Sequence, residues 1–256
     1  LRTQVTSINQ GVSNGNSAIA LLQIADKSMA EQSKILDTVK SKLIQANTDT
    51  TSQAGRTAIA KDITKLLQQL NNIGEQTNYN GTTLLQKART TADASKEANL
   101  TAARSAKGGL SFQIGEGTAD LITTRTINSN VAGLKLSALA KAVRSGAKVS
   151  AGATAGTTGV FTRTMAQSGQ KAIDDAITTL NGYRGDIGST QNQVESAVRN
   201  LMTQSTNIKA AESVIRDVDY AEESANFNKL NIISQAGSYA ISQSNATQQN
   251  VLKLLQ

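Results

Sequence analysis

The sequence predicts a mainly α protein: a long antiparallel helical rod of coiled-coil type with a small β-hairpin part. Three observations predict this fold class. The chain has no proline, a residue that costs on the order of 3 kcal/mol inside a helix. Aromatic residues make up only 3% of the chain and hydrophobic residues 38%, so aliphatic side chains must form the core. Apolar residues also recur every seven positions over long stretches at both ends, as in coiled coils.

The first predicted helix runs from Leu1 to Ala46. One column of its heptads is mostly apolar: Ile8, Gly15, Leu22, Met29, Leu36 and Leu43. A second column, three positions earlier, begins with Val5, Val12 and Ile19 and then turns polar at Asp26, Ser33 and Lys40. The helix that packs here must therefore tolerate a half-polar stripe. A loop is expected over Asn47–Gly55, whose residues favour local side-chain hydrogen bonds over helix.

A second helix follows, with apolar residues at helical spacing from Ile59 to Ile73 and a stop near Gly74. Asn78–Gly81 is then expected to form a tight turn, because Asn-Gly readily adopts positive φ. Alternation and β-branched residues predict short strands at Leu110–Ile114 and Leu121–Ile127. Residues 145–159 are mostly Gly, Ala, Ser and Thr with nothing large enough to bury, which predicts a surface loop or mobile tip.

The C-terminal part has the most regular heptads, and we call this column the core seam: Ile173, Leu180, Ile187, Val194, Leu201, Ile208 and Ile215. Within it, Gly182, Gly185 and Gly188 weaken helix propensity and are expected to mark close backbone approach. The final helix is small and polar in its middle and apolar at its ends, so it needs partners from outside the chain. Its expected assembly residues are Leu230, Ile233, Val251, Leu252, Leu254 and Leu255.

These elements predict five segments along the chain. They are N-terminal core helices and turn over 1–105, a small β part over 106–144, a short variable tip over 145–165, a C-terminal core helix over 166–215 and a C-terminal assembly helix over 216–256.

The composition argues against catalysis, a cofactor or a metal site. Without His or Cys there is no imidazole or thiolate nucleophile and no usual zinc ligand set. The adjacent pairs Asp174-Asp175 and Glu222-Glu223 would point about 100° apart on a helix and do not face each other. We therefore expect no enzyme.

The net charge of +7 raises a nucleic-acid binder as an alternative, which would show DNA affinity that falls by orders of magnitude with salt. The Lys and Arg residues, however, look scattered along the first helices without interleaved aromatics, so a solvated helix surface is favoured and no nucleic acid is expected as a partner. No run of about 18 apolar residues predicts a membrane span, and no apolar leader with a small-residue cleavage site follows Leu1.

Several segments, taken together, resemble one family. In chain order they are Ile19–Asp26, Thr77–Gly81 followed by Leu84-Leu85, Leu110–Gly115, Arg184–Asn192, Ala211–Glu223 and Gln249–Gln256. In this order and spacing the sequence resembles bacterial flagellin, the subunit of the flagellar filament. The resemblance covers both ends of the chain and leaves out only about residues 145–167.

The resemblance implies a structural subunit that is secreted and polymerises into the extracellular bacterial flagellum for motility. It implies self-association, a flagellar export chaperone and the filament cap as partners. The family's first stretch is expected to be missing here, which would leave the helix after about Arg216 without its usual partner, and the short central part implies a thin, smooth filament. A flagellar junction protein or a minor secreted flagellin-like protein remains the alternative.

Two further expectations come from the resemblance. Where recognised flagellins present Arg, Leu and Glu to an animal innate receptor, this chain has Thr38, Lys42 and Gln69, which implies evasion of that receptor. Several flagellins carry O-linked glycans in their outer region, which makes the hydroxyls of one segment candidates for modification: Ser145, Ser150, Thr154, Thr157, Thr158, Thr162 and Thr164.

Overall fold

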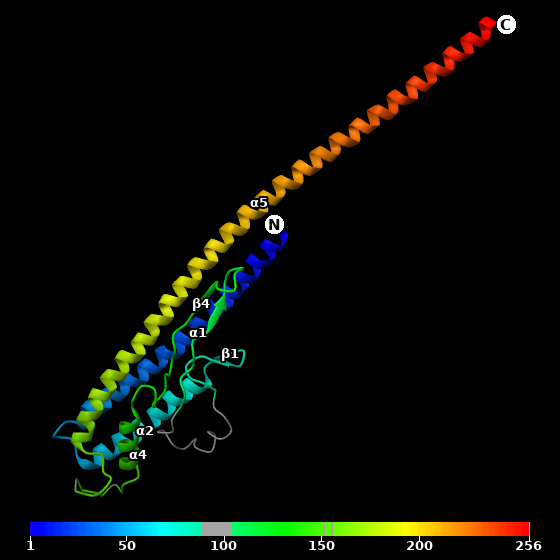
Figure 1. Cartoon of the computed structure of the whole chain (residues 1–256). Coiled ribbons are helices and arrows are strands. Elements are labelled where there is room, and N and C mark those ends of the chain that lie inside the picture. Colours follow the sequence, from blue (N-terminus) through cyan, green and yellow to red (C-terminus); the bar gives the residue numbers. More distant parts are fainter. Residues whose placement is uncertain (89–103, 151, 155, 256) are drawn as a thin grey trace. The chain divides into compact units, whose positions relative to one another are not determined.

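The computed structural model describes residues 1–88, 104–150, 152–154 and 156–255 (Figure 1). The chain forms two compact units, a larger one over Ser7–Leu201 and a smaller one made of Leu1–Thr6 and Met202–Gln256. The elements are α1 (Arg2–Ala46), α2 (Gln53–Gln76), β1 (Asn78–Tyr79), β2 (Thr82–Thr83), β3 (Ser111–Gln113), β4 (Leu121–Thr123), α4 (Ser137–Ala147) and α5 (Arg163–Leu255).

In the larger unit, α1 and α5 pack antiparallel, as the heptads predict. Ion pairs fix the direction: Lys40 Nζ lies 2.7 Å from Asp174 Oδ1, and Arg184 Nε lies 3.0 Å from Asp26 Oδ1. Lys40 and Asp26 are two of the residues that made the second column of α1 half-polar. Their partners on α5 explain how that stripe is tolerated. Because all four side chains are more than a third exposed, such pairs set register more than they add stability.

The buried face of α1 confirms one predicted column and corrects the other. Ile8, Leu22, Met29, Leu36 and Leu43 are buried, as expected. The second buried column, however, lies three positions after the first rather than three before: Gly11, Ala18, Ala25, Gln32, Val39 and Ala46. Its residues are mostly small, so it carries little hydrophobic signal in the sequence. Small side chains here let the neighbouring elements approach α1 closely.

The connection from α1 to α2 is shorter than predicted. Ser52 is the N-cap of α2, and its hydroxyl oxygen accepts a hydrogen bond from Gly55 N at 3.0 Å. Gln53, Ala54 and Gly55 are therefore helical instead of looped, because this cap satisfies an otherwise unpaired N–H group. At its other end α2 continues past Gly74 to Gln76.

The β parts are two small antiparallel pairs. β1 and β2 form the predicted Asn-Gly hairpin, in which Asn80 and Gly81 both have positive φ, at 51° and 83°. β3 pairs with β4 in the register Phe112 opposite Ile122. β4 ends at Thr123, so the predicted strand to Ile127 is too long, and Ile127 makes only an isolated bridge with Lys107.

The segment predicted to hold only β structure also contains the helix α4. Its buried residues Leu139, Ala140 and Val143 follow helical spacing, and α4 packs against α2. The predicted tip is anchored as well, because Val160 and Phe161 are buried in its second half. Two large apolar residues just beyond the Gly/Ala/Ser/Thr run thus return the chain to the core before α5 begins.

A buried polar cluster ties the irregular segment around Ser129 to the helices. Gln32 Nε2 donates to the carbonyl oxygens of Leu70 at 3.1 Å and Ser129 at 2.8 Å, and the Ser129 hydroxyl donates back to Gln32 Oε1. Asn71 Oδ1 accepts from Val131 N at 2.8 Å. The bonds to the Ser129 carbonyl and the Val131 N–H pair backbone groups that lie outside the helices.

Candidate functional site

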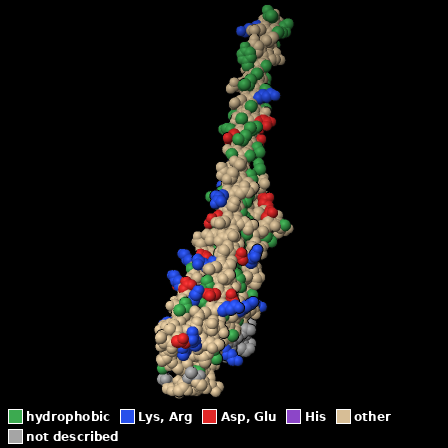
Figure 2. Space-filling model, turned by 90° about the vertical axis from the view of Figure 1, so that its left-hand side faces the viewer, with side chains coloured by type: hydrophobic (Ala, Val, Ile, Leu, Met, Phe, Trp, Pro, Cys, Tyr) green, Lys and Arg blue, Asp and Glu red, His purple; other side chains and the backbone are tan. Residues whose placement is uncertain are grey.

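The most distinctive surface is the apolar side of α5 in the smaller unit. All six predicted assembly residues are exposed there, from 49% for Val251 to 87% for Leu254. The upper part of Figure 2, the C-terminal part of α5, shows hydrophobic side chains repeatedly at the surface. A helix with this many exposed Leu, Ile and Val side chains is typical of a protein-binding surface.

The helix is continuous through this region. α5 runs for 93 residues without a break, so the predicted core helix and assembly helix are parts of one element. Within the smaller unit, Arg2 Nε lies 3.0 Å from Glu212 Oε1, and Arg216 Nε lies 3.8 Å from the same oxygen. The hydrogen bond from Arg2, followed by the charge of Arg216, lowers the pKa of Glu212 below its ordinary value.

The core seam is buried only in the larger unit. Ile173, Leu180, Ile187, Val194 and Leu201 are at most 8% exposed. Ile208 is half-buried and Ile215 is 50% exposed, so the last two residues of the predicted core seam are not buried in the core. The reason is local: in the smaller unit the rest of the described chain beside α5 is only the first turns of α1, Leu1–Thr6.

The expected role of three glycines in α5 is wrong. A Cβ at Gly182, Gly185 or Gly188 would meet nothing within 4 Å, so these residues do not mark close packing. The close approach occurs on α1 instead, at Gly11 and Gly15. A Cβ on Gly15 would overlap Cγ2 of Val198, and one on Gly11 would overlap the carbonyl oxygen of Ile114.

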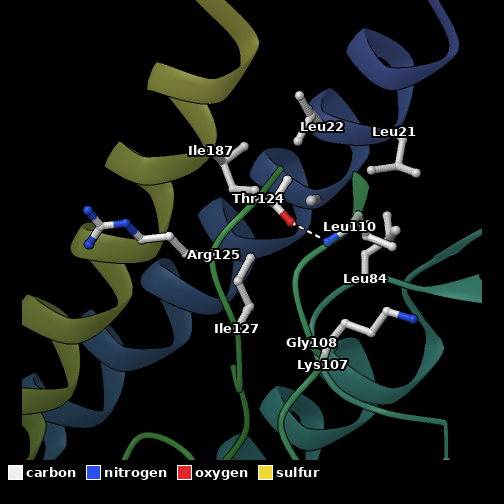
Figure 3. Close-up of a pocket in the computed structure, with 11 residues that line it drawn as sticks. Leu21, Leu22, Leu84, Lys107, Gly108, Leu110, Thr124, Arg125, Ile127 and Ile187 are labelled. Atoms are coloured by element: carbon white, nitrogen blue, oxygen red, sulfur yellow. Dashed lines mark hydrogen bonds between the residues drawn. The ribbon is translucent and has the colours of Figure 1, made fainter. Parts of the chain in front are cut away.

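One pocket of the larger unit, at the junction of its helices and the segments next to its strands, is too small for a small-molecule ligand. Figure 3 shows residues that line this pocket, among them Leu21 and Leu22 of α1, Ile187 of α5, and Leu84, Leu110 and Ile127 from the irregular segments. The Thr124 hydroxyl oxygen accepts from Leu110 N at 2.8 Å and holds two of these segments together. The cavity holds about 10 Å³, the least that one water molecule needs.

The remaining predicted site residues lie on the surface. Thr38 and Lys42 are one turn apart on α1, and Lys42 Nζ lies 3.4 Å from Asp62 Oδ2 of α2. Gln69 is exposed on α2, two turns beyond Asp62. The candidate glycosylation residues are exposed too, except Thr162, which is half-buried and caps α5 by accepting from Met165 N at 3.2 Å. Ser145 lies in α4 and not in the predicted loop.

No group of three acidic side chains in the described part of the chain is arranged to hold a metal ion. No helix among the described residues has the length and hydrophobicity to cross a bilayer.

The fold and the surface therefore define a structural protein of long helices with exposed apolar side chains on α5. Comparison with known proteins identifies the class more closely. Residues 1–90 match the family model described as the bacterial flagellin N-terminal helical region, and residues 170–255 match the bacterial flagellin C-terminal helical region. The chain belongs to the bacterial flagellin family.

Individual relatives agree with this assignment. The chain is 31% identical to flagellin of Bacillus subtilis over all of its length and 83% of the relative's. It is 26% identical to flagellin A of Helicobacter pylori, over all of the chain and 89% of that protein.

Solved structures show the same fold. A crystal structure of Bacillus cereus flagellin matches 78% of this chain and 94% of its own, with a TM-score of 0.53 at 22% identity. A putative flagellar hook-associated protein of Vibrio parahaemolyticus matches 82% of the chain and 92% of its own, with a TM-score of 0.61 at 14% identity. Its membership of the flagellin family and its likeness to the flagellin of Bacillus subtilis make the protein a structural subunit of the bacterial flagellar filament, an extracellular assembly.

Proposed function

We propose that the exposed side of α5 is the surface through which subunits associate in the filament. We call the six residues named above, from Leu230 to Leu255, the assembly stripe. Its exposure carries the proposal: Leu252 is 60% exposed and Leu255 79%. Burial of one such side chain contributes about 1.5–3 kcal/mol, so covering several of them by helices of neighbouring subunits would favour association.

The proposal separates a core rod from an assembly tail, with the tail beginning at about Arg216. It predicts that backbone amides from Ala221 to Leu255 exchange rapidly in the monomer and become protected on assembly. Hydrogen exchange followed by mass spectrometry measures this, with the buried α5 segment around Leu180 as the internal control. Strong protection from Ala221 to Leu255 in a verified monomer would contradict the proposal.

We also propose that the chain is secreted and that a flagellar export chaperone and the filament cap are its partners, as membership of the flagellin family supports. The purified chain and the export chaperone of the same cell are expected to elute together in size-exclusion chromatography. The Leu252→Ala, Leu255→Ala double variant tests whether the assembly stripe takes part. Separate elution of the unsubstituted pair would argue against the chaperone as a partner.

The exposed hydroxyls at the tip are proposed sites of O-glycosylation. Ser150, Thr154, Thr157 and Thr158 are exposed and lie outside the helices, where a transferase can reach them. Intact mass of protein isolated from its native cell would then exceed the mass of the unmodified chain. An unmodified mass would end this proposal.

A further inference from the structure

The net positive charge is concentrated in one part of the larger unit. Residues 121–173 contain seven Lys and Arg and no Asp or Glu, which equals the whole net charge of +7, so the rest of the chain is balanced. Among the seven, Arg163 pairs with Asp49, and Arg125 lies 4.0 Å from Asp186. In the described part of the chain no carboxylate pairs with Lys135, Lys141, Lys148 or Lys171.

An apolar groove lies among these lysines, between α4 and the start of α5. Its volume is about 250 Å³, below the roughly 300–1,000 Å³ of small-molecule sites and suited to a few side chains. Leu139 and Gly169 are buried at its floor, where a Cβ on Gly169 would lie 2.8 Å from Leu139 Cδ1. The groove is lined by Ala138, Leu139, Ala142, Thr164, Met165, Ser168, Gly169 and Ala172.

Lysines adjoin the groove on both helices. Lys141 is exposed next to Ala142 on α4, and Lys171 is exposed next to Ala172 on α5. The first carboxylates beyond the groove along α5 are Asp174, which pairs with Lys40, and Asp175. An apolar groove with lysines beside it therefore fits a ligand with a narrow apolar stripe and negative charge next to that stripe, such as an acidic amphipathic helix.

The smaller unit carries such a helix. In residues 212–223 of α5, Val214 and Val218 are one turn apart and 63% and 58% exposed. Four exposed carboxylates lie beside them, and no Lys or Arg pairs with them among the described residues: Asp217, Asp219, Glu222 and Glu223. We call residues 212–223 the acidic segment.

This apolar pair is separate from the assembly stripe. In steps of seven towards the N-terminus, Leu230 leads to Glu223 and Arg216, and Ile233 leads to Asn226 and Asp219. Neither series contains Val214 or Val218. The assembly stripe and the acidic segment can thus be covered by different partners at the same time.

We infer that the acidic segment of one subunit docks into the lysine-flanked groove between α4 and α5 of a second subunit. Val214 and Val218 enter the groove, and the carboxylates of the segment pair with Lys141 and Lys171. The inference rests on the function as a filament subunit and adds a second subunit contact, distinct from the assembly stripe. Complementary charge fixes which surfaces meet, and the apolar groove excludes water from the contact.

Cysteine cross-linking tests this contact directly, because the natural chain has no Cys and only introduced pairs can react. The Ala138→Cys chain is mixed with the Val218→Cys chain and oxidised at increasing protein concentration. A mixed dimer that forms with rising concentration, at least about fivefold above the control, is expected. The control pairs Val218→Cys with Thr178→Cys, which is exposed on α5 but does not line the groove.

Charge reversal separates the proposed pairing from a general effect on the fold. Adding Lys141→Glu and Lys171→Glu to the groove chain should lower the mixed dimer about tenfold, and Asp217→Lys with Glu222→Lys in the other chain should restore it. Raising salt from about 0.01 M to about 1 M, which shortens the Debye length from about 30 Å to 3 Å, should also lower it. Restoration by the second pair of substitutions cannot result from a merely unfolded first chain.

The outcomes distinguish this contact from the assembly stripe. Leu252→Ala with Leu255→Ala should prevent sedimentable polymers and leave the mixed dimer in solution unchanged, so a failure of the stripe proposal does not remove this one. A mixed dimer no more abundant than the Thr178→Cys control, both in solution and in sedimented polymers, would overturn the inference. Loss of the dimer by charge reversal without recovery in the doubly reversed pair would overturn it as well.

Discussion

The guanidinium of Arg2 donates a hydrogen bond from Nε to Oε1 of Glu212 at 3.0 Å, joining the first turn of α1 to α5 across 210 residues of sequence. Arg2 is 78% exposed and Glu212 17% exposed at their side chains. This contact belongs to the smaller unit, in which Leu1–Thr6 are the described residues that accompany α5. Loss of this contact would therefore show that the start of α1 has separated from α5 in the smaller unit.

The docking of Leu1–Thr6 should depend on pH in the acid range. The pKa of Glu212 is lowered, chiefly by the hydrogen bond from Arg2. The contact therefore stabilises this unit fully at pH values above the range in which a carboxyl group ordinarily titrates. It is lost as pH falls through the lowered pKa, when the carboxylate is protonated. Carbon-13 NMR titration of the Glu212 carboxyl should give a lower midpoint in the natural chain than in Arg2→Ala. Equal midpoints would contradict the contact.

Glycine substitutions should separate close packing from mere helix weakness. Gly15→Ala places a Cβ on Cγ2 of Val198, and a β-branched side chain has little room to yield, so we expect a loss of about 1–3 kcal/mol in unfolding free energy. Gly182→Ala meets nothing within 4 Å and should gain up to about 1 kcal/mol from helix propensity. Chemical denaturation of both variants measures the difference; a stabilising Gly15→Ala would show that the helices are further apart.

Truncating a buried leucine and an exposed one should affect different properties. Leu201→Ala removes a side chain that is 8% exposed and faces Gly11, and should cost about 2–5 kcal/mol and lower the melting temperature. Leu252→Ala alters a side chain that is 60% exposed and should leave monomer melting unchanged while weakening polymerisation. Calorimetry and sedimentation measure the two effects. Equal shifts in monomer melting would contradict the division into core rod and assembly tail.

The chain should evade the animal innate receptor that recognises many flagellins. Thr38 and Gln69 lack the charges of the Arg and Glu expected there, and Lys42 presents an ammonium where an apolar anchor is expected. Arg anchors at interfaces often carry about 2 kcal/mol or more, so the three differences together should abolish useful affinity. A cell reporter assay should show little response at the concentration that suffices for a recognised flagellin.

Restoring the three anchor residues found in recognised flagellins tests this prediction. Thr38→Arg, Lys42→Leu and Gln69→Glu together should raise the reporter response, because they return the anchor types to surface positions on α1 and α2. Lys42→Leu alone also removes the ion pair with Asp62 and serves as a control for effects on α1–α2 packing. A full response to the natural chain would show that the assumed correspondence of positions is wrong.

What the sequence determines is local order. The absence of proline, the column from Ile8 to Leu43 and the core seam were enough to predict long antiparallel helices, because helical periodicity is a property of neighbouring residues along one chain. Asn80-Gly81 likewise predicted its own hairpin, since positive φ at both residues is set by their chemistry. The family resemblance needed only the order of such segments.

What only the tertiary structure decided is which surfaces meet. The second buried column of α1, from Gly11 to Ala46, is made mostly of small residues. Their burial depends on an opposing element, so it gives little hydrophobic signal in the sequence. Gly15 and Gly182 look alike in sequence, yet only Gly15 faces Val198. Leu201 and Ile215 belong to one heptad column, but burial ends between them because it requires a partner alongside, and no periodicity within a single helix says where that partner stops.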